Sequence, residues 1–228
     1  YPDVCSIQLF GITDSGKVIF MQRSTSTGEN SIIIYNSEDQ TFTDGTPSEG
    51  LDTFSAQNPN CNNFGLIIGQ KIIDGKTRAV VVDTTAKTLR VLPMLPQSNN
   101  TTDASYATAV NNNGIVVGCC AVNGQPRWVI WDALGNVHDL GLPPSFLGGL
   151  TTGINDEGMV IGTAGKDSGS SAFIRLSDGR WINLGLFEGI SASYPYGLNN
   201  QGQVVGVSDP PDEFGSRQSR PVIWSPIN

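Results

Sequence analysis

The chain has 228 residues, of which 13 are basic and 21 acidic, so its formal net charge is -8. Affinity for nucleic acid comes mainly from neutralising phosphates, and no basic stripe stands out, so we expect no nucleic-acid partner. No apolar run approaches the roughly 18 residues of a membrane-spanning helix, so we expect no membrane span. The length fits one large domain, which we place at 1–228 because a repeat runs through the sequence.

One pattern returns five times along the chain. Its clearest copies, 111–118, 155–162 and 199–206, each read Asn-x-x-Gly, then an apolar run and a second Gly. The turn glycines stand at 16, 65, 114, 158 and 202, so the spacings are 49, 49, 44 and 44 residues. A fixed period of this size indicates a repeat architecture. The five predicted units are 5–50, 51–99, 100–145, 146–189 and 190–228.

The sequence pattern of each unit predicts the same series of short strands. In the third unit the strands are 107–110, 115–117, 128–131 and 137–141, and the Asn-x-x-Gly turn joins the first two. Asn tolerates left-handed backbone and Gly takes positive φ without steric cost, so this tetrapeptide predicts a tight hairpin turn. The strands are rich in β-branched and aromatic residues, and 27 Gly and 13 Pro interrupt the chain too often for helices.

Five units of four strands suit radial repetition. We therefore predict an all-β fold, a five-bladed β-propeller with about four antiparallel strands per blade. A linear solenoid is the alternative, but it needs capping units with polar outer faces, whereas the first and last copies keep their apolar runs. The fifth unit ends before its fourth strand. Either residues 1–4 supply that strand or the last blade has three; we predict three strands with partial N-terminal cover.

The repeat resembles the HAF repeat, a bacterial family described as an extracellular repeat. That family has an A-x-G-I-N-x-x-G-x-V-V-G core, then A-F-x-W and D-L-G, and the match is close in 153–162 with Ala172-Phe173 and Asn183-Leu184-Gly185. The first unit departs, with Phe20 in place of the second Gly. The resemblance covers nearly the whole chain and implies a fold and an export route rather than an activity. Because residue 1 is Tyr, which fits a removed signal peptide or a trimmed chain, we expect a secreted, extracellular location.

The chain has four cysteines, Cys5, Cys61, Cys119 and Cys120. In the repeat frame Cys61 lies beside the turn, whereas the adjacent pair lies up the second strand, beyond the roughly 7 Å that a disulfide spans between Cα atoms. We expect free thiols, with a bridge between Cys119 and Cys120 as the alternative. No Cys-x-x-Cys or paired His spacing exists, so we expect no metal and no cofactor.

The residues that could carry catalysis are few. His138 is the only histidine, and its predicted place on an outer strand indicates an exposed structural residue. Asp3, Asp52 and Asp103 fall 11 to 13 residues before their turn glycines. Acids from separate blades around a central funnel could serve as the acid and the base or nucleophile of a glycosidase. The alternative, which we favour, is that they cap turns in solvated loops. The glycine-rich stretch 147–149 lacks the Lys and Ser/Thr of a phosphate loop and is interpreted as a turn.

The loops that lead into the units hold most of the aromatic residues that look exposed. In a propeller these loops share one face around the channel, and Tyr and Arg on rigid loops are typical anchors for protein or sugar ligands. The alternative is that these aromatics fill the spaces between blades. The candidate ligand-binding residues are Tyr106, Arg127, Phe146, Tyr194 and Tyr196.

Turn or core chemistry explains every repeated residue, and no repeated catalytic set remains. We therefore expect an exported, non-enzymatic binding or adhesion module that recognises a protein or surface ligand through one face of the propeller. A carbohydrate-binding lectin is the first alternative, and a glycosidase-like enzyme with carboxylates at the central funnel is the second. We also predict that Gly118, Gly162 and Gly206 lie at close contacts between blades or at positive φ.

Overall fold

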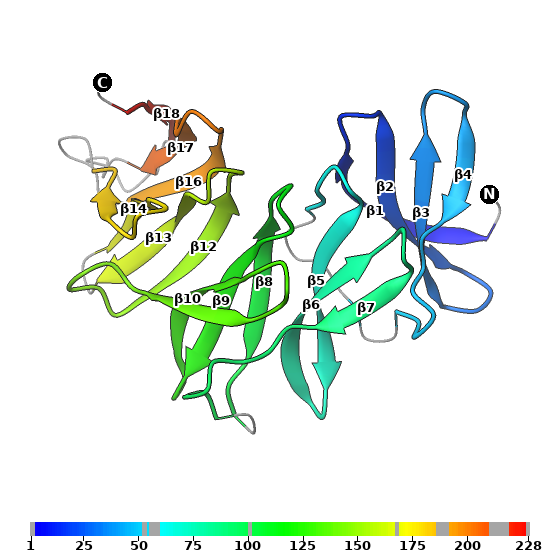
Figure 1. Cartoon of the computed structure of the whole chain (residues 1–228), viewed down its shortest axis with the longest axis horizontal. Coiled ribbons are helices and arrows are strands. Elements are labelled where there is room, and N and C mark those ends of the chain that lie inside the picture. Colours follow the sequence, from blue (N-terminus) through cyan, green and yellow to red (C-terminus); the bar gives the residue numbers. More distant parts are fainter. Residues whose placement is uncertain are drawn as a thin grey trace.

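The fold is known from a computed structural model that describes residues 3–51, 54, 60–99, 102–166, 169–185, 192–209 and 219–226. Within these ranges the chain forms 18 strands, which pair into five antiparallel sheets. Each sheet is made of consecutive strands, and Figure 1 shows the sheets following one another from the N-terminal to the C-terminal end. The described residues include no helix long and apolar enough to cross a membrane.

Each sheet is one blade and corresponds to one predicted unit. Blade 1 contains β1 (Val4–Ile12), β2 (Lys17–Ser24), β3 (Asn30–Asn36) and β4 (Thr41–Asp44). Blade 2 contains β5 (Leu66–Ile73), β6 (Lys76–Asp83) and β7 (Thr88–Val91). Blade 3 contains β8 (Ser105–Val110), β9 (Val116–Val122), β10 (Gln125–Trp131) and β11 (Val137–Gly141). Blade 4 contains β12 (Gly148–Ile154), β13 (Val160–Lys166), β14 (Gly169–Arg175) and β15 (Trp181–Asn183). Blade 5 contains β16 (Ala192–Leu198), β17 (Val204–Asp209) and β18 (Arg220–Trp224).

The first strands β8, β12 and β16 lie side by side. The predicted propeller fold is confirmed.

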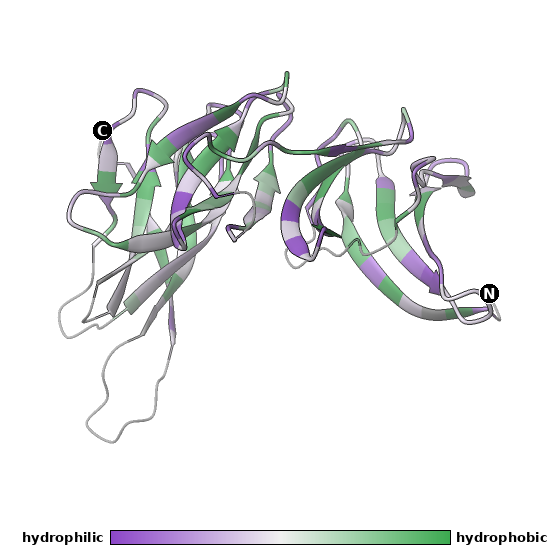
Figure 2. Ribbon diagram, turned by 90° about the horizontal axis from the view of Figure 1, so that it is seen from below, coloured by the Kyte–Doolittle hydropathy of each residue, from purple (hydrophilic) through white to green (hydrophobic). Residues whose placement is uncertain are grey.

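Blades 1 and 5 lie at opposite ends of the longest axis in both views (Figures 1 and 2). Blade 5 has three strands in the described residues, as predicted. The predicted N-terminal cover of this blade is wrong for Val4, which pairs with Ser24 inside blade 1. The reason is length, because the nine residues of β1 make a complete inner strand for their own sheet.

The core consists of four clusters, one between each pair of neighbouring blades. Successive side chains of a strand point to opposite faces, so the second strand of each interior blade, 2 to 4, contributes to two clusters. The residue two positions after the turn Gly faces the preceding blade, and the next residue faces the following one. In blade 3 these residues are Val116, which packs with Ile68 of blade 2, and Val117, which packs with Val160 of blade 4.

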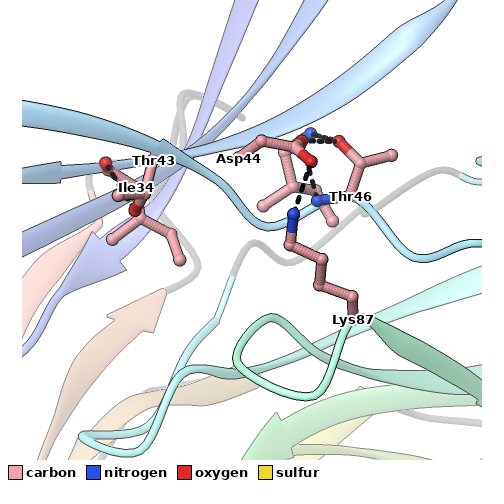
Figure 3. Close-up of polar contacts among 6 residues, drawn as sticks. Ile34, Thr43, Asp44, Thr46 and Lys87 are labelled. Carbon is pink, nitrogen blue, oxygen red and sulfur yellow. Dashed lines mark hydrogen bonds and ion pairs between the residues drawn. The ribbon is translucent and has the colours of Figure 1, made fainter.

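Polar contacts add to this packing at the edge of blades 1 and 2 (Figure 3). Lys87, in the turn between β6 and β7, forms an ion pair of 2.9 Å with Asp44 at the end of β4. The other carboxylate oxygen of Asp44 accepts hydrogen bonds from the backbone N–H and the hydroxyl of Thr46. Both charged side chains are about half exposed, so the ion pair stabilises the fold little.

The Asn-x-x-Gly turns have the predicted geometry. In blade 3 the Gly114 N–H donates to the Asn111 carbonyl at 3.1 Å, and Gly114 has a φ of 73°. The side-chain Oδ1 of Asn111 accepts the N–H groups of Asn113 at 3.1 Å and Ile115 at 2.9 Å. Gly is needed for the left-handed φ, and Asn supplies the acceptor that ties the turn together.

The first strands of four blades, β1, β8, β12 and β16, are here called the inner strands. They share a β-bulge six residues before the turn Gly, at Phe10, Thr108, Thr152 and Tyr196. In three of them the bulged side chain contacts the following blade. The Phe10 ring lies 6.3 Å from that of Phe54, the Thr108 hydroxyl lies 2.6 Å from that of Thr151, and Thr152 donates to the Pro195 carbonyl at 2.9 Å. The bulge therefore turns one residue per blade toward its neighbour.

The predicted close contact between blades is confirmed for Gly162 and is wrong for Gly118 and Gly206, and none of the three has a positive φ. A Cβ on Gly162 would lie 2.5 Å from Cζ2 of Trp128 in blade 3, so Gly162 is a contact between blades. A Cβ on Gly118 or Gly206 would instead meet a tryptophan of its own blade, Trp131 or Trp224, at 2.9 Å.

Candidate functional site

The turns that contain the five turn glycines meet on one face of the molecule, here called the Asn-turn face; four of them read Asn-x-x-Gly, and the turn of blade 1 begins with Thr13. In blades 2, 3 and 4 the first Asn of the turn links its blade to the next through its side-chain Nδ2. Asn62 donates to the Asn111 carbonyl at 3.0 Å, Asn111 to the Asn155 carbonyl at 2.9 Å, and Asn155 to the Asn199 carbonyl at 2.9 Å. Each Asn thus satisfies its own turn and binds the following one.

The second residue of each turn forms a parallel ladder. The Asp14 N–H donates to Oδ1 of Asn63 at 2.9 Å, and the Asn63 N–H donates to Oδ1 of Asn112 at 2.9 Å. The Asn112 N–H donates to Oδ1 of Asp156 at 2.8 Å, and the Asp156 N–H donates to Oδ1 of Asn200 at 3.0 Å. These hydrogen bonds fix each accepting side chain relative to the preceding blade.

The ladder residues surround a polar pocket of about 280 Å³. Asp14, Asn63, Asn112, Asp156 and Asn200, one from each blade, line it together with the first Asn of three turns. Their amides and carboxylates offer both donors and acceptors in fixed positions. Such a site can bind a ligand that carries hydroxyl or amide groups.

Asp156 supplies one of the two carboxylates in this pocket. Partial burial acts to raise the pKa of Asp156, but hydrogen bonds from the backbone and side chain of Asn112 and from Asn200 outweigh it. The pKa is therefore lowered, and the group is charged at neutral pH. A negative charge in the pocket favours ligands that donate hydrogen bonds.

Two of the predicted ligand-binding residues, Tyr106 and Tyr194, occupy one repeat position, eight residues before the turn Gly. Leu150 holds the same position in blade 4, and all three pair with the equivalent residue of the second strand. Tyr106 and Leu150 are exposed and Tyr194 is half-buried. Because β8, β12 and β16 are neighbours, the three side chains form a row across the inner strands.

The other three predicted ligand-binding residues do not join this row. Phe146 packs edge-on against Phe173 at 4.8 Å in the core between blades 3 and 4, which is the space-filling role that was the alternative. Arg127 forms an ion pair of 2.8 Å with Asp139 on the outer strand of its own blade. Tyr196 is the bulged residue of β16 and is exposed.

Two of the three candidate carboxylates, Asp3 and Asp103, lie in the part of the chain that the structure describes. Asp103 is buried, and its oxygens accept the backbone N–H groups of Asn99 at 2.8 Å, Asn123 at 3.0 Å and Gly124 at 2.9 Å. These hydrogen bonds, those from Asn99 and Gly124 foremost, lower the pKa of Asp103. Its geometry is that of a loop anchor, because the side chain is buried and both oxygens accept backbone N–H groups. Asp3 is exposed at the start of blade 1, and Asp52 lies outside the described residues.

His138 is exposed, and its Nε2 lies 3.0 Å from the Asp132 carboxylate in the turn between β10 and β11. Hydrogen bonds from His138 and then Asn136 lower the pKa of Asp132. This pair ties an outer turn together, which agrees with the structural interpretation of His138.

Cys61, Cys119 and Cys120 are free, as predicted. Cys119 and Cys120 belong to different interblade clusters, on opposite faces of β9, and burial raises their pKa values to about 11 and about 12. Among the described residues no three His, Cys, Asp or Glu side chains gather into a possible metal site.

The polar pocket was not among the predicted sites. Its signal was the pair of polar residues that opens each repeat, which the sequence pattern explained as turn chemistry alone. What the pattern did not reveal is that these side chains also bond the neighbouring turns and together line one pocket.

No protein-family model matches the chain, and no curated protein matches it. Solved structures of β-propeller proteins do. The chain is similar to TolB from Acinetobacter baumannii, with a TM-score of 0.53 and 16% identity, over 97% of this chain and 58% of that one. It is also similar to a protein described as TolB from Agrobacterium tumefaciens, with a TM-score of 0.56 and 16% identity, over 94% and 73%. Virginiamycin B lyase from Staphylococcus aureus matches with a TM-score of 0.50 and 16% identity, over 96% and 69%. Identities this low show the fold alone, and the chain spans 58% of the length of the Acinetobacter protein.

Proposed function

We propose that this chain is a non-enzymatic binding module that recognises a protein or surface ligand through its Asn-turn face. The observation that carries the proposal is the pocket of about 280 Å³ to which all five blades contribute one polar side chain. The interblade ladders hold these side chains in place before any ligand arrives, so little conformational entropy is lost on binding. The resemblance to the HAF repeat supports an exported, extracellular setting for this module.

The glycosidase alternative has less support than the binding role. Its best-defined carboxylate, Asp103, is buried and accepts three backbone N–H groups. A glycosidase needs two carboxyl groups on either side of one bond, and a buried loop anchor cannot serve as one of them.

A lectin is the second candidate, and the chemistry of the pocket favours it. Amide and carboxylate groups in fixed positions are suited to the donor and acceptor pairs of sugar hydroxyls. Because the pocket lies where the five turns meet, it predicts one sugar per chain rather than one per blade. Calorimetry would therefore give a stoichiometry near one, whereas a value near five would contradict this location.

The test uses a glycan array and a peptide array, probed with the natural chain and with two variants. Asp156→Asn removes the charge of the pocket while keeping its shape, and Tyr106→Ala removes an exposed ring outside it. We expect a ligand that binds the natural chain and Tyr106→Ala alike and Asp156→Asn at least about tenfold more weakly, as for a lost charge-assisted hydrogen bond. A ligand lost with Tyr106→Ala alone would move the site to the inner-strand row. Failure of every probe to bind the natural chain would count against the binding role.

A further inference from the structure

The two terminal blades expose surfaces that every interior blade buries. On the second strand, the residue three positions after the turn Gly faces the following blade, and Ile19, Ile68, Val117 and Ile161 are at most 1% exposed there. The same position in blade 5 is Val205, which is 48% exposed. Its cross-strand partner Ile223 is 68% exposed, whereas the equivalent Ile174 of blade 4 is buried. We call this surface of blade 5, which Val205, Ile223 and Tyr196 mark, the forward face.

The bulge of β16 gives independent evidence for the same surface. Phe10, Thr108 and Thr152 each use this bulge to contact the following blade. Tyr196, the equivalent residue of blade 5, is 66% exposed. Tyr196 is therefore exposed at a position that contacts the following blade in three other blades. Together with Val205 and Ile223 it forms an apolar surface at the positions that make blade contacts elsewhere.

Blade 1 exposes the surface that in interior blades faces the preceding blade, and we call this surface its backward face. Ile7, Leu9 and Ile12 are all exposed, and Ile7 also lines a shallow groove with Phe20, Ile33 and Phe42. In interior blades the positions equivalent to Ile7 and Leu9 contact the preceding blade, as Ser105 and Thr151 do. Figure 2 shows hydrophobic segments on strands at both ends of the molecule.

The two exposed faces are complementary in hydrogen bonding. At two interior junctions a third-strand N–H donates to a serine hydroxyl of the following blade, from Ala79 to Ser105 at 2.9 Å and from Ala172 to Ser193 at 2.9 Å. In blade 5 the donor position is Pro221, which has no N–H. In blade 1 the acceptor position is Ile7, which has no hydroxyl. Joining the forward face to the backward face therefore leaves no polar group unpaired at this point.

The faces are also complementary in size. The fourth position after the turn Gly is a glycine in blades 2 to 5, and in blade 4 this glycine receives Trp128 of the preceding blade. Blade 1 has Phe20 there instead, on its backward face. The residue that would face it from blade 5 is the small Pro221, so the large and small partners are exchanged relative to the junction of blades 3 and 4.

The ladder ends on the Asn-turn face fit the same junction. The Nδ2 of Asn199 donates to Gln203 of its own turn at 2.8 Å, where the equivalent Asn residues reach the next blade. A backward face placed there offers the Thr13 carbonyl to Asn199 and the Asp14 carboxylate to the N–H of Asn200. Both would continue the ladders in the pattern of the interior junctions.

We propose that the forward face of blade 5 binds the backward face of blade 1 in a second copy of this chain. A second copy carries a surface that matches the forward face in polarity, size and hydrogen bonding. Since the two faces of one molecule lie at opposite ends of its longest axis, a second copy reaches them without rearrangement (Figure 1). Because the two contacting surfaces differ, the association is head to tail and continues from copy to copy.

The experiment measures molar mass by light scattering and sedimentation from about 1 µM to about 100 µM chain, a range that detects micromolar association. Ile223→Lys blocks the forward face and Ile7→Lys blocks the backward face, each at an exposed position where the fold tolerates charge. Leu134→Lys, at an exposed leucine in an outer turn of blade 3, is the matched control. Tyr196→Lys and Leu9→Lys test the same two faces a second time if either first variant fails to give a cooperative melt.

We expect the natural chain and Leu134→Lys to exceed the monomer mass increasingly with concentration, and both face variants to remain monomeric. Mixing Ile223→Lys with Ile7→Lys restores one intact pair of faces, so the mixture forms a one-to-one dimer and nothing larger. A natural chain that stays monomeric throughout would overturn the proposal, and so would a mixture that fails to form the dimer. Loss of assembly in Leu134→Lys would also overturn it, because the association would then not depend on the two faces.

Discussion

The junction between blades 3 and 4 differs from its two neighbours at one position of the repeat. On the third strand, blades 2 and 4 have Ala79 and Ala172, whose N–H groups each donate to a serine hydroxyl of the following blade. Blade 3 has Trp128 there, and the serine position of blade 4 is Gly149. One junction is thus closed by an aromatic ring in a glycine-lined slot, and the others by a hydrogen bond between small residues. The same backbone accommodates both arrangements because the two contacting residues differ together: a small third-strand residue faces a serine, and the large Trp128 faces a glycine.

The aromatic junction is built from a cluster of rings. Trp128 is fully buried, its ring lies 5.0 Å from that of Trp181, and Trp181 in turn lies 6.4 Å from Phe173. In the part of the chain that the structure describes, the Nε1 of Trp128 is buried without a hydrogen-bond partner. An unsatisfied N–H costs free energy, so shape and apolar burial must supply the stability of this junction.

The largest effect is therefore expected for Trp128→Ala. Removing a fully buried indole leaves a cavity between two blades and should destabilise the fold by about 3–5 kcal/mol. Trp128→Phe keeps much of the apolar volume and removes the unpaired N–H, so it should cost clearly less. Chemical denaturation of the two variants measures the difference. Equal losses would mean that the indole N–H is paired after all.

Gly162→Val tests the other side of the same slot. A Cβ at this position would meet the Leu150 carbonyl and the Trp128 ring, so we expect a loss of about 2–4 kcal/mol from overpacking. In a Trp128→Ala background the added valine occupies the vacated space, and the two losses should then be less than additive. Thermal and denaturant unfolding of the single and double variants measure this coupling. Full additivity would show that the two residues do not share one slot.

Gly165→Val is the matched control for this series. It lies on the same strand, β13, and a Cβ there would have its nearest neighbour, the Ser170 hydroxyl, at 3.8 Å. Its change in stability should stay within about 1 kcal/mol, the span of strand preferences. Gly169, on the neighbouring strand β14, would not serve as a control, because its φ of 145° is a conformation that L residues rarely adopt.

Ser105→Ala tests the hydrogen-bonded kind of junction. The substitution leaves the Ala79 N–H buried without its acceptor, which should cost about 1–3 kcal/mol. Ser193→Ala should behave alike at the junction of blades 4 and 5, and the exposed Ser177→Ala should change little. Denaturant unfolding of the three variants is the measurement. A loss for Ser177→Ala as large as for Ser105→Ala would show that the effect does not come from the buried N–H.

The repeat predicted what depends on the chain's own turn and strand chemistry. The positive φ of Gly114, the hairpins and the blade count follow from residues within one unit, and all three agree with the structure. The slot for Trp128 was missed because Gly149 was interpreted as part of a turn, whereas it lies in β12. Its role depends on a residue 21 positions earlier in another blade, and single-unit patterns carry no information about such pairs.

The candidate site was predicted less well, for a related reason. Tyr196 looked like a ligand anchor because it is aromatic and close to a loop, but it lies at the bulge that contacts a following blade in three other units. Asp103 looked available because it precedes its turn Gly at a spacing close to that of Asp3 and Asp52, but three backbone N–H groups bind its oxygens. In both cases the deciding partner is a backbone atom or a neighbouring blade, which the side-chain type does not reveal.

The smallest change in stability is expected for substitutions on the Asn-turn face. There the ladder of second turn residues crosses both the aromatic junction and a hydrogen-bonded junction. The Asn63–Asn112 rung joins two amides across blades 2 and 3, whereas the Asn112–Asp156 rung across blades 3 and 4 ends on a carboxylate. Because its hydrogen bonds lower the pKa of Asp156 below the ordinary value of about 3.9, the carboxylate stabilises the folded state above that value. This contribution disappears as the pH falls through the lower, folded-state pKa.

Asp156→Asn removes that titration while keeping an acceptor for the Asn112 N–H. The stability difference between the natural chain and this variant should therefore be constant from neutral pH down to about 4.5 and shrink below about 4, where the unfolded carboxyl takes up its proton first. Denaturant unfolding of both chains at closely spaced pH values measures the difference and cancels the other acidic groups, which the two chains share. Asn112→Asp moves a second carboxylate next to Asp156, so like charges should destabilise it near neutral pH and less so in acid. A difference for Asp156→Asn that does not change with pH would mean that the rung does not depend on the charge. The junction of blades 3 and 4 would then differ from its neighbours only in its tryptophan slot.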